Sequence, residues 1–223
     1  MKKKGIALVE RQYLFPFVLI TSLFFLWGFA HAILDVLNKH FQELLTITRT
    51  HSAMIQATMY MGYFIMAIPA GLFINRHGYR RGVVLGLLLY GTGSLLFIPG
   101  QYIASFNMFL FSLFVIGCGL TFLETAANPY VTELGARETA ASRLNFAQSF
   151  NGLGCIFAPI LTGLLLFSDD DKGAGGNVAL PYAVMGVVVL LAALAFVRVP
   201  LPEIPHEEEV DSEGRRVSLW SHK

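Results

Sequence analysis

Two acidic side chains, Asp35 and Glu124, directly follow long uncharged stretches of the chain. A carboxylate at the centre of a bilayer costs about 2.5–3.5 kcal/mol on insertion scales, so its presence needs a reason. Removal from water favours the neutral form of a carboxyl group, which can then hold a proton and release it when the site becomes wet. The two residues therefore point to proton binding. A structural role is the alternative, and Glu124, which has no evident buried cation, is the more informative residue.

Polar side chains recur at helical spacing around both carboxylates. Residues three or four apart share one face of a helix. Three such faces occur in the sequence: Gly28, His31, Asp35 and Asn38; Cys118, Thr121, Glu124 or Thr125, and Asn128; and Asn145, Gln148 and Asn151. The economical arrangement turns all three faces toward one water-filled cavity. Alternatively, the uncharged side chains only bond neighbouring helices, at about 0.6 kcal/mol per pair.

His31 lies one helical turn from Asp35, a spacing that also occurs in pairs of metal ligands. Because the same face carries no further Cys or His, we expect His31 to be a hydrogen-bond partner and expect no metal ion. Cys118 and Cys155 both lie in apolar stretches, so the sequence indicates no disulfide framework.

Long uncharged stretches dominate the 223-residue chain, which is 55% apolar and only 14% charged. They cover 12–34, 50–75, 82–123, 144–168 and 173–197, and about 20 apolar residues suffice for a helix to cross a bilayer. The longest stretch is expected to hold two spans that are separated at Pro99-Gly100. The sequence thus predicts six spans: Phe15–Asn38, Ser52–Ile74, Gly82–Pro99, Ser105–Tyr130, Leu144–Phe167 and Leu180–Val197.

The predicted spans should be α-helices, because backbone polar groups in lipid must be paired within their own segment. This pattern excludes a water-soluble globular fold and predicts an all-α membrane protein. The net charge of +1 indicates no nucleic-acid partner. Gly62 precedes Pro69 by the same interval as Gly152 precedes Pro159, which suggests two inverted three-helix repeats.

The placement of basic residues predicts the orientation of the chain. With both termini in the cytoplasm, only Lys39, Arg49 and Lys172 of the 16 Lys and Arg residues lie outside. We expect a cytoplasmic segment over 1–13, a six-helix bundle over 14–199 and a polar cytoplasmic segment over 200–223. The last of these is acidic and is expected to be disordered.

The loop after the second predicted span resembles a known motif. The stretch Gly71-Leu-Phe-Ile-Asn75-Arg76-His77-Gly78-Tyr79-Arg80-Arg81 is similar to the G-x-x-x-D-R-x-G-R-R/K motif of the major facilitator superfamily. In that family the Asp and the Arg residues form a charge-linked latch between helices. The resemblance implies a gating role for Gly71, Asn75, Arg76, Gly78, Arg80 and Arg81. Asn75 departs from the motif, since an amide keeps the hydrogen bonds of the Asp but not its charge.

The fourth predicted span resembles one subfamily in particular. Leu123-Glu124-Thr125-Ala126-Ala127-Asn128-Pro129-Tyr130 is similar to the L-E-T-A-A-N-P-[FY] signature of the fucose–proton symporter subfamily, which includes glucose/galactose transporters. Further similar stretches are Phe24 to Trp27, Tyr63-Phe64, Ile68 to Gly71 and Arg143 to Asn151. The resemblance extends over residues 14–200.

What the resemblance implies is proton-coupled sugar uptake without a cofactor. Glu124 and Asp35 would be the proton-coupling carboxylates. The sugar site would be lined by Trp27, His31, Asn128, Gln148 and Asn151. Trp27 is the best candidate for stacking on a sugar ring, and helix packing is its alternative role. The fucose transporter has consecutive Asn residues where this chain has His31 and Ala32, so L-fucose, glucose and galactose stay open, as does sodium in place of the proton.

The number of spans separates this chain from the family pattern. Members have twelve spans in two six-helix halves, whereas this chain has six and stops in what would be the central loop. The resemblance therefore implies the N-terminal half of a transporter of the cytoplasmic (inner) membrane. Its partners would be sugar, proton, the lipid bilayer and a missing C-terminal six-helix half. A truncated membrane protein with a structural or assembly role is the alternative. An enzyme is not expected, because no Gly-x-Ser-x-Gly or His-Glu-x-x-His motif occurs.

Overall fold

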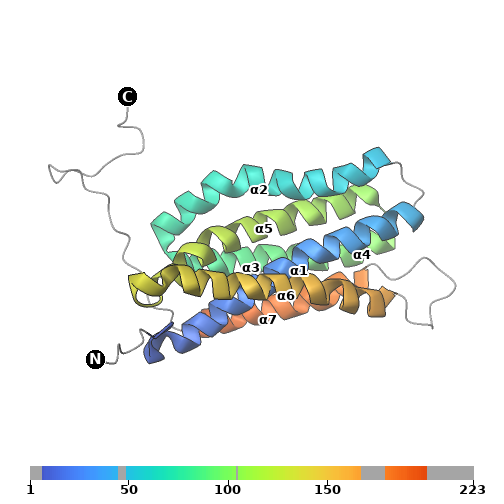
Figure 1. Ribbon diagram of the computed structural model, residues 1–223. Coiled ribbons are helices and arrows are strands. Elements are labelled where there is room, and N and C mark those ends of the chain that lie inside the picture. Colours follow the sequence, from blue (N-terminus) through green and yellow to red (C-terminus); the bar gives the residue numbers. More distant parts are fainter. Residues whose placement is uncertain (1–6, 45–48, 104, 167–178, 200–223) are drawn as a thin grey trace, which may run out of the picture.

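The computed structural model describes residues 7–44, 49–103, 105–166 and 179–199. Every regular element in these ranges is helical, and the long helices run side by side in one bundle (Figure 1). The short 3₁₀ helices are η1 (Arg11–Tyr13) and η2 (Arg137–Thr139). The α-helices are α1 (Leu14–Leu44), α2 (Arg49–His77), α3 (Tyr79–Leu95), α4 (Phe97–Ile103), α5 (Phe106–Glu133), α6 (Ala140–Leu166) and α7 (Ala179–Arg198). The predicted segment over 200–223 lies outside the described residues.

The expected break at Pro99-Gly100 was wrong in position. Both residues lie inside α4, and the long helical path is interrupted at Leu96 and again after Ile103. Proline is tolerated in the first turn of a helix because its missing N–H would have no partner there. Pro99 is the third residue of α4, so it begins a helical segment rather than ending one.

Among the described residues, five helical segments are long and apolar enough to cross a membrane, namely Arg11–Val36, Ala53–His77, Tyr79–Ile103, Phe106–Glu133 and Ala179–Arg198. The set treats α3 and α4 as one span and does not include α6. Helix α6 packs along α1 over a large contact and completes the bundle.

Part of the helix pairing agrees with two inverted repeats. The most extensive contacts join α1 to α6, α2 to α5, α3 to α5 and α3 to α7. Exchanging α1 with α5 and α2 with α6 converts the first pair into the second, as an internal two-fold axis requires. Within the described ranges, the α3–α5 contact has no counterpart of similar extent between α7 and α1. In Figure 1, α2 and α7 lie at opposite edges of the bundle, and the site described below lies where α1, α2 and α5 meet.

Glycines at the helix contacts allow this close packing. A Cβ atom at Gly154 of α6 would lie closer than 3.0 Å to the Phe25 carbonyl oxygen of α1, and one at Gly28 would meet the Asn151 carbonyl oxygen equally closely. A Cβ atom at Gly117 of α5 would likewise lie closer than 3.0 Å to the Met59 carbonyl oxygen of α2. Without a hydrophobic driving force between helices in lipid, such small residues are what let backbones approach and pack.

We expect Gly154→Ala to lower the stability of the bundle by about 1–3 kcal/mol, the usual range for overpacking. The reason is that the added methyl group meets backbone of α1, which cannot move aside as a flexible side chain would. Gly152 is the matched control on the same helix, because a Cβ there meets nothing within 4 Å. Thermal unfolding of both variants in detergent tests the difference, and equal melting temperatures would contradict the packing.

Candidate functional site

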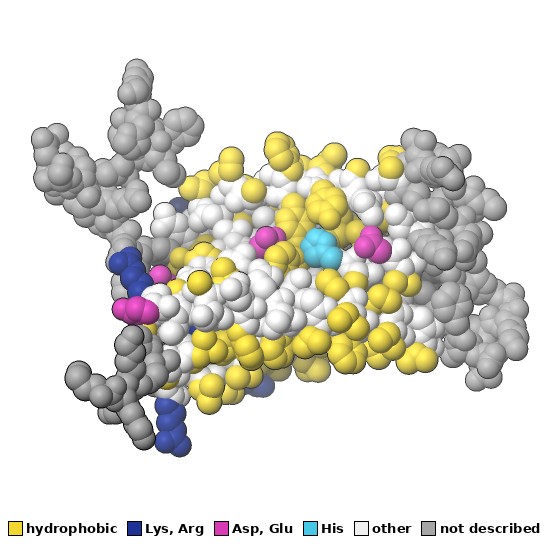
Figure 2. All heavy atoms as spheres, in the orientation of Figure 1, with side chains coloured by type: hydrophobic (Ala, Val, Ile, Leu, Met, Phe, Trp, Pro, Cys, Tyr) yellow, Lys and Arg dark blue, Asp and Glu magenta, His cyan; other side chains and the backbone are white. Residues whose placement is uncertain are grey.

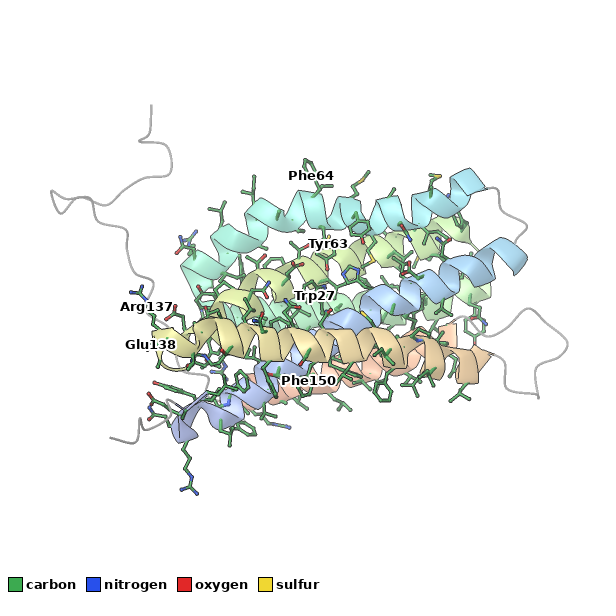
Figure 3. All side chains as sticks on the ribbon, viewed as in Figure 1. Trp27, Tyr63, Phe64, Arg137, Glu138 and Phe150 are labelled. Carbon is green, nitrogen blue, oxygen red and sulfur yellow. The ribbon has the colours of Figure 1, made fainter. Side chains whose placement is uncertain are left out.

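A hydrogen-bonded cluster of aromatic side chains joins α1 to α2. The Trp27 indole Nε1–H donates to the Tyr63 hydroxyl at 3.0 Å, and the His31 Nε2 lies 3.1 Å from the same oxygen. The ring centroids of Trp27 and His31 are 6.0 Å apart. Figure 3 shows Trp27 and Tyr63 in the middle of the bundle, whereas Phe64 points away from it and is 85% exposed. Tyr63 therefore connects α2 to the polar face of α1 by hydrogen bonds.

Glu124 lies beside this cluster at a small, partly open hollow whose cavity volume is about 10 Å³, roughly the space of one water molecule. The pocket is lined by Leu23, Phe24, Trp27, Leu123, Glu124, Ala127 and Asn128. Glu124 is half-buried, and no charged side chain of the described residues compensates its charge. The carboxylate therefore borders an opening on the inside of the α1, α2 and α5 corner rather than being held by a cation.

Asn128 contributes a second polar group to the same pocket. Its Oδ1 is buried and has no hydrogen-bond partner among the described residues. A buried carbonyl oxygen without a partner loses free energy, about 1–3 kcal/mol, unless a ligand or water satisfies it. The pocket thus combines an indole, a carboxylate and an amide with a free acceptor, which is suitable for binding a hydroxylated molecule.

Asp35 lies one turn beyond His31 and is exposed. Its Oδ1 accepts a hydrogen bond of 3.0 Å from Gln56 Nε2 of α2. On the face shown in Figure 2 a histidine side chain lies between two acidic side chains midway along the bundle. Of the first-helix face predicted from the sequence, His31 and Asp35 are therefore partnered by α2, whereas Gly28 is buried against α6.

The structure does not bring the predicted α6 residues into the Glu124 pocket. Gln148 is exposed, and Asn151 is half-buried with its Nδ2 donating to the Phe24 carbonyl at 3.3 Å. Thr121 likewise donates to the carbonyl of its own helix at Gly117, at 2.8 Å. For Asn151 the helix-bonding alternative describes the observed contact, whereas the Thr121 hydrogen bond stays within α5.

The first turn of α3, directly after Gly78, positions one arginine against another helix. Arg80 Nε donates to the Phe196 carbonyl at 3.2 Å, and its Nη2 donates to the Val197 carbonyl, so it binds the last turn of α7. A cation at a helix C-terminus is favourable for the helix dipole. Gly78 has φ of 85°, a left-handed conformation that glycine adopts without strain. The side chains of Asn75, Arg76 and Arg81 are exposed, and Gly71 has open space around its Cα.

Sequence reasoning missed the roles of three residues. Arg143 is fully buried and binds the end of α5, although the sequence named it only as the start of a stretch similar to the subfamily. Gln56 and Tyr63 were not identified as site residues, yet with Tyr60 they are spaced by four and three residues on α2. That helical spacing was the available signal, and it was hidden because two of the three side chains are aromatic.

Comparison with known proteins places these features in a family. The family model described as Major Facilitator Superfamily matches residues 17–222. The L-fucose-proton symporter of Haemophilus influenzae is 46% identical over 76% of this chain and 40% of its own length. The glucose/galactose transporter of Brucella abortus is 36% identical over 96% of this chain and 53% of its own length. The chain spans about half the length of the curated relatives it matches.

Solved structures agree with this assignment. A crystal structure of the fucose:proton symporter of Escherichia coli superposes with a TM-score of 0.71 at 37% identity, covering 86% of this chain and 50% of that protein. The proton:xylose symporter XylE superposes with a TM-score of 0.72 at 15% identity, which shows a shared fold alone. The chain therefore belongs to the major facilitator superfamily, as a multi-pass, all-helical membrane protein with the architecture of one half of that fold.

Proposed function

We infer that this chain is the N-terminal half of a proton-coupled sugar transporter. The observation that carries the proposal is the pocket in which the Glu124 carboxylate, the Trp27 indole and the unpartnered Asn128 carbonyl meet. Relatives named for L-fucose–proton symport and for glucose/galactose transport support the substrate class. The proposed coupling ion is the proton, in keeping with the relatives that are named L-fucose-proton symporters.

In the proposed cycle, Glu124 takes up a proton while the pocket is open to the outside. The neutral carboxyl group then permits a sugar to bind, with its ring stacked on Trp27 and one of its hydroxyls donating to Asn128 Oδ1. Gln148 and Asn151 would approach the sugar from α6 only after that helix shifts, because neither lines the pocket in this conformation. Rocking of the bundle exposes the site to the cytoplasm, where Glu124 releases its proton. Asp35, held by Gln56, assists proton entry from the outer end of α1.

The proposal requires a second six-helix half, since a site of this type lies between two halves that move against each other. We propose that both termini and the Arg80 contact with α7 lie on the cytoplasmic side of the inner membrane. There Arg80, which joins α3 to α7, would keep the motif over residues 71–81 packed against the bundle. The complete protein that carries this segment is thus the unit whose transport is tested.

Uptake of labelled L-fucose, D-glucose and D-galactose by the complete protein in proteoliposomes tests the proposed function. In sodium-free buffer, an inward proton gradient should concentrate at least one of these sugars, and a protonophore should abolish the accumulation. Accumulation that requires a sodium gradient would leave sugar transport standing and refute proton coupling. If none of the three sugars is bound or moved, the proposed substrate class is wrong.

Asn128→Leu should weaken sugar binding about tenfold, because it removes a hydrogen bond worth about 1.5 kcal/mol. The matched control is Asn145→Leu on α6, where the amide is exposed and does not line the pocket. Isothermal titration of the detergent-solubilised protein measures both affinities. Equal affinities for the Asn128 variant and the wild type would exclude Asn128 from the sugar site.

A further inference from the structure

The Tyr63 hydroxyl holds a position in which its hydrogen-bonding pattern is constrained on two sides. An indole N–H can only donate, so Trp27 occupies one lone pair of the Tyr63 oxygen. The remaining side-chain neighbour at hydrogen-bond distance is His31 Nε2, at 3.1 Å. An imidazole nitrogen accepts when it is bare and donates when it is protonated. The direction of the second hydrogen bond therefore depends on the state of His31.

We propose that Tyr63, whose hydroxyl oxygen accepts from the pocket-lining Trp27, is a further ligand-binding residue beside the pocket and that His31 sets the polarity of its hydroxyl group. With neutral His31, the Tyr63 O–H donates to Nε2, and its second lone pair is left to accept from a sugar hydroxyl. With charged His31, Nε2–H donates to the Tyr63 oxygen, both lone pairs are used, and the hydroxyl proton turns to the ligand. This inference deepens the proposed sugar site and rests on it for the identity of the ligand.

The neutral form has one satisfied arrangement among the described contacts. If neutral His31 carried its proton on Nε2, the Tyr63 oxygen would receive two donors and the hydroxyl proton would have no acceptor in the cluster. A half-buried hydroxyl left in that state loses the free energy of a hydrogen bond. The contacts within the cluster thus favour the Nδ1–H tautomer when His31 is neutral and no ligand is bound.

The charged and titratable groups around His31 come from its own helix and from the helices packed against it. On α1, the Asp35 carboxylate acts on the imidazole from one turn away. On α2, the rings of Tyr60 and Tyr63 lie 6.2 and 5.9 Å from it between centroids. From α5, Glu124 acts electrostatically on the Tyr63 hydroxyl. On α6, the Cys155 thiol reaches α1 only at the Gly28 carbonyl. His31 therefore lies between the two carboxylates of the proposed coupling pathway.

The tautomer is tested without any sugar. In the complete protein labelled with ¹⁵N-histidine, the difference between spectra of the wild type and of His31→Asn isolates the His31 ring nitrogens. At pH 8.5 we expect Nε2 to give the shift of an unprotonated nitrogen and Nδ1 that of a protonated one. The opposite assignment overturns the proposal, and it does so even if the proposed transport function is also wrong.

The ligand contact is tested by sugar affinity in a Glu124→Gln background, which removes the titration of that carboxyl group. Using whichever of L-fucose, D-glucose or D-galactose binds, Tyr63→Phe should weaken binding at pH 8.5 at least fivefold. Affinity should change at least threefold between pH 8.5 and pH 5.5, and this change should vanish in Tyr63→Phe and in His31→Asn. Tyr60→Phe is the control, since its ring neighbours His31 but its hydroxyl makes none of these hydrogen bonds. A pH dependence that survives in Tyr63→Phe contradicts the proposal.

Discussion

Replacement of Glu124 by Gln should abolish sugar accumulation by the complete protein while leaving sugar exchange intact. Glutamine has the shape and neutrality of the protonated carboxyl group, so the sugar site stays formed but no proton is carried. An inward gradient of two pH units is worth about 2.7 kcal/mol for one proton, enough to concentrate a sugar about a hundredfold. The accumulation ratio of Glu124→Gln should therefore fall from about that value to about one.

Two companion variants make this result specific. Glu124→Ala should lose accumulation and exchange together, because it removes both the proton carrier and the polar wall of the pocket. Glu133→Gln, on the same helix but exposed, should behave as the wild type. Retained accumulation by Glu124→Gln would show that another group couples the proton. Loss of exchange in that variant would mean that the charged carboxylate itself binds the sugar.

Replacement of Arg143 by Leu should destabilise the protein by about 3–5 kcal/mol, the range for breaking a buried charged network. The guanidinium is completely buried where α6 begins. It donates to the carbonyls of Val131 at 3.1 Å, Ala136 at 3.0 Å and Leu8 at 3.3 Å, to the Thr139 hydroxyl at 2.6 Å and to the Thr132 carbonyl. Two of these oxygens belong to the last turn of α5, which is left unpaired when the donors are lost.

The comparison for this prediction is Arg76→Leu, a substitution of an exposed arginine in the last turn of α2. Exposed substitutions usually change stability by less than about 0.5 kcal/mol. Arg143→Lys should lose an amount of stability between those of Arg143→Leu and Arg76→Leu. An ammonium group keeps the charge but cannot bind five oxygens with its three donors. Chemical denaturation in detergent gives the three values. An Arg143→Leu variant as stable as Arg76→Leu would show that water replaces the guanidinium at the end of α5.

The helices could be predicted from the sequence because uncharged stretches of membrane length are a strong signal. The contacts between the helices could not be predicted, because the sequence does not distinguish a glycine at a helix crossing from one that faces open space. Gly154 and Gly152 illustrate this, because one packs against α1 and the other meets nothing. The position of the break near Pro99 was also missed, because a proline ends a helix or begins one depending on its place in the first turn.

The Glu124 pocket could be anticipated in part. Glu124 and Asn128 are one turn apart on α5, so their shared face follows from helical spacing. Trp27 of α1 lines the same pocket. The hydrogen bonds of Tyr63 with Trp27 and His31 depend on how α2 is rotated relative to α1. The sequence pattern of a single helix does not determine that rotation. The same reason explains why Gln148 was expected near Glu124 but is exposed on α6.

The most direct test of the central claim is the movement of protons when sugar is added. De-energised proteoliposomes that contain the complete protein are placed in weakly buffered, sodium-free medium, and the external pH is recorded as sugar is added. The account predicts an immediate alkalinisation that follows the sugar taken up and is absent in Glu124→Gln. Sugar entry with no change in external pH, or an equal change in Glu124→Gln, would contradict the role of Glu124 as the proton carrier.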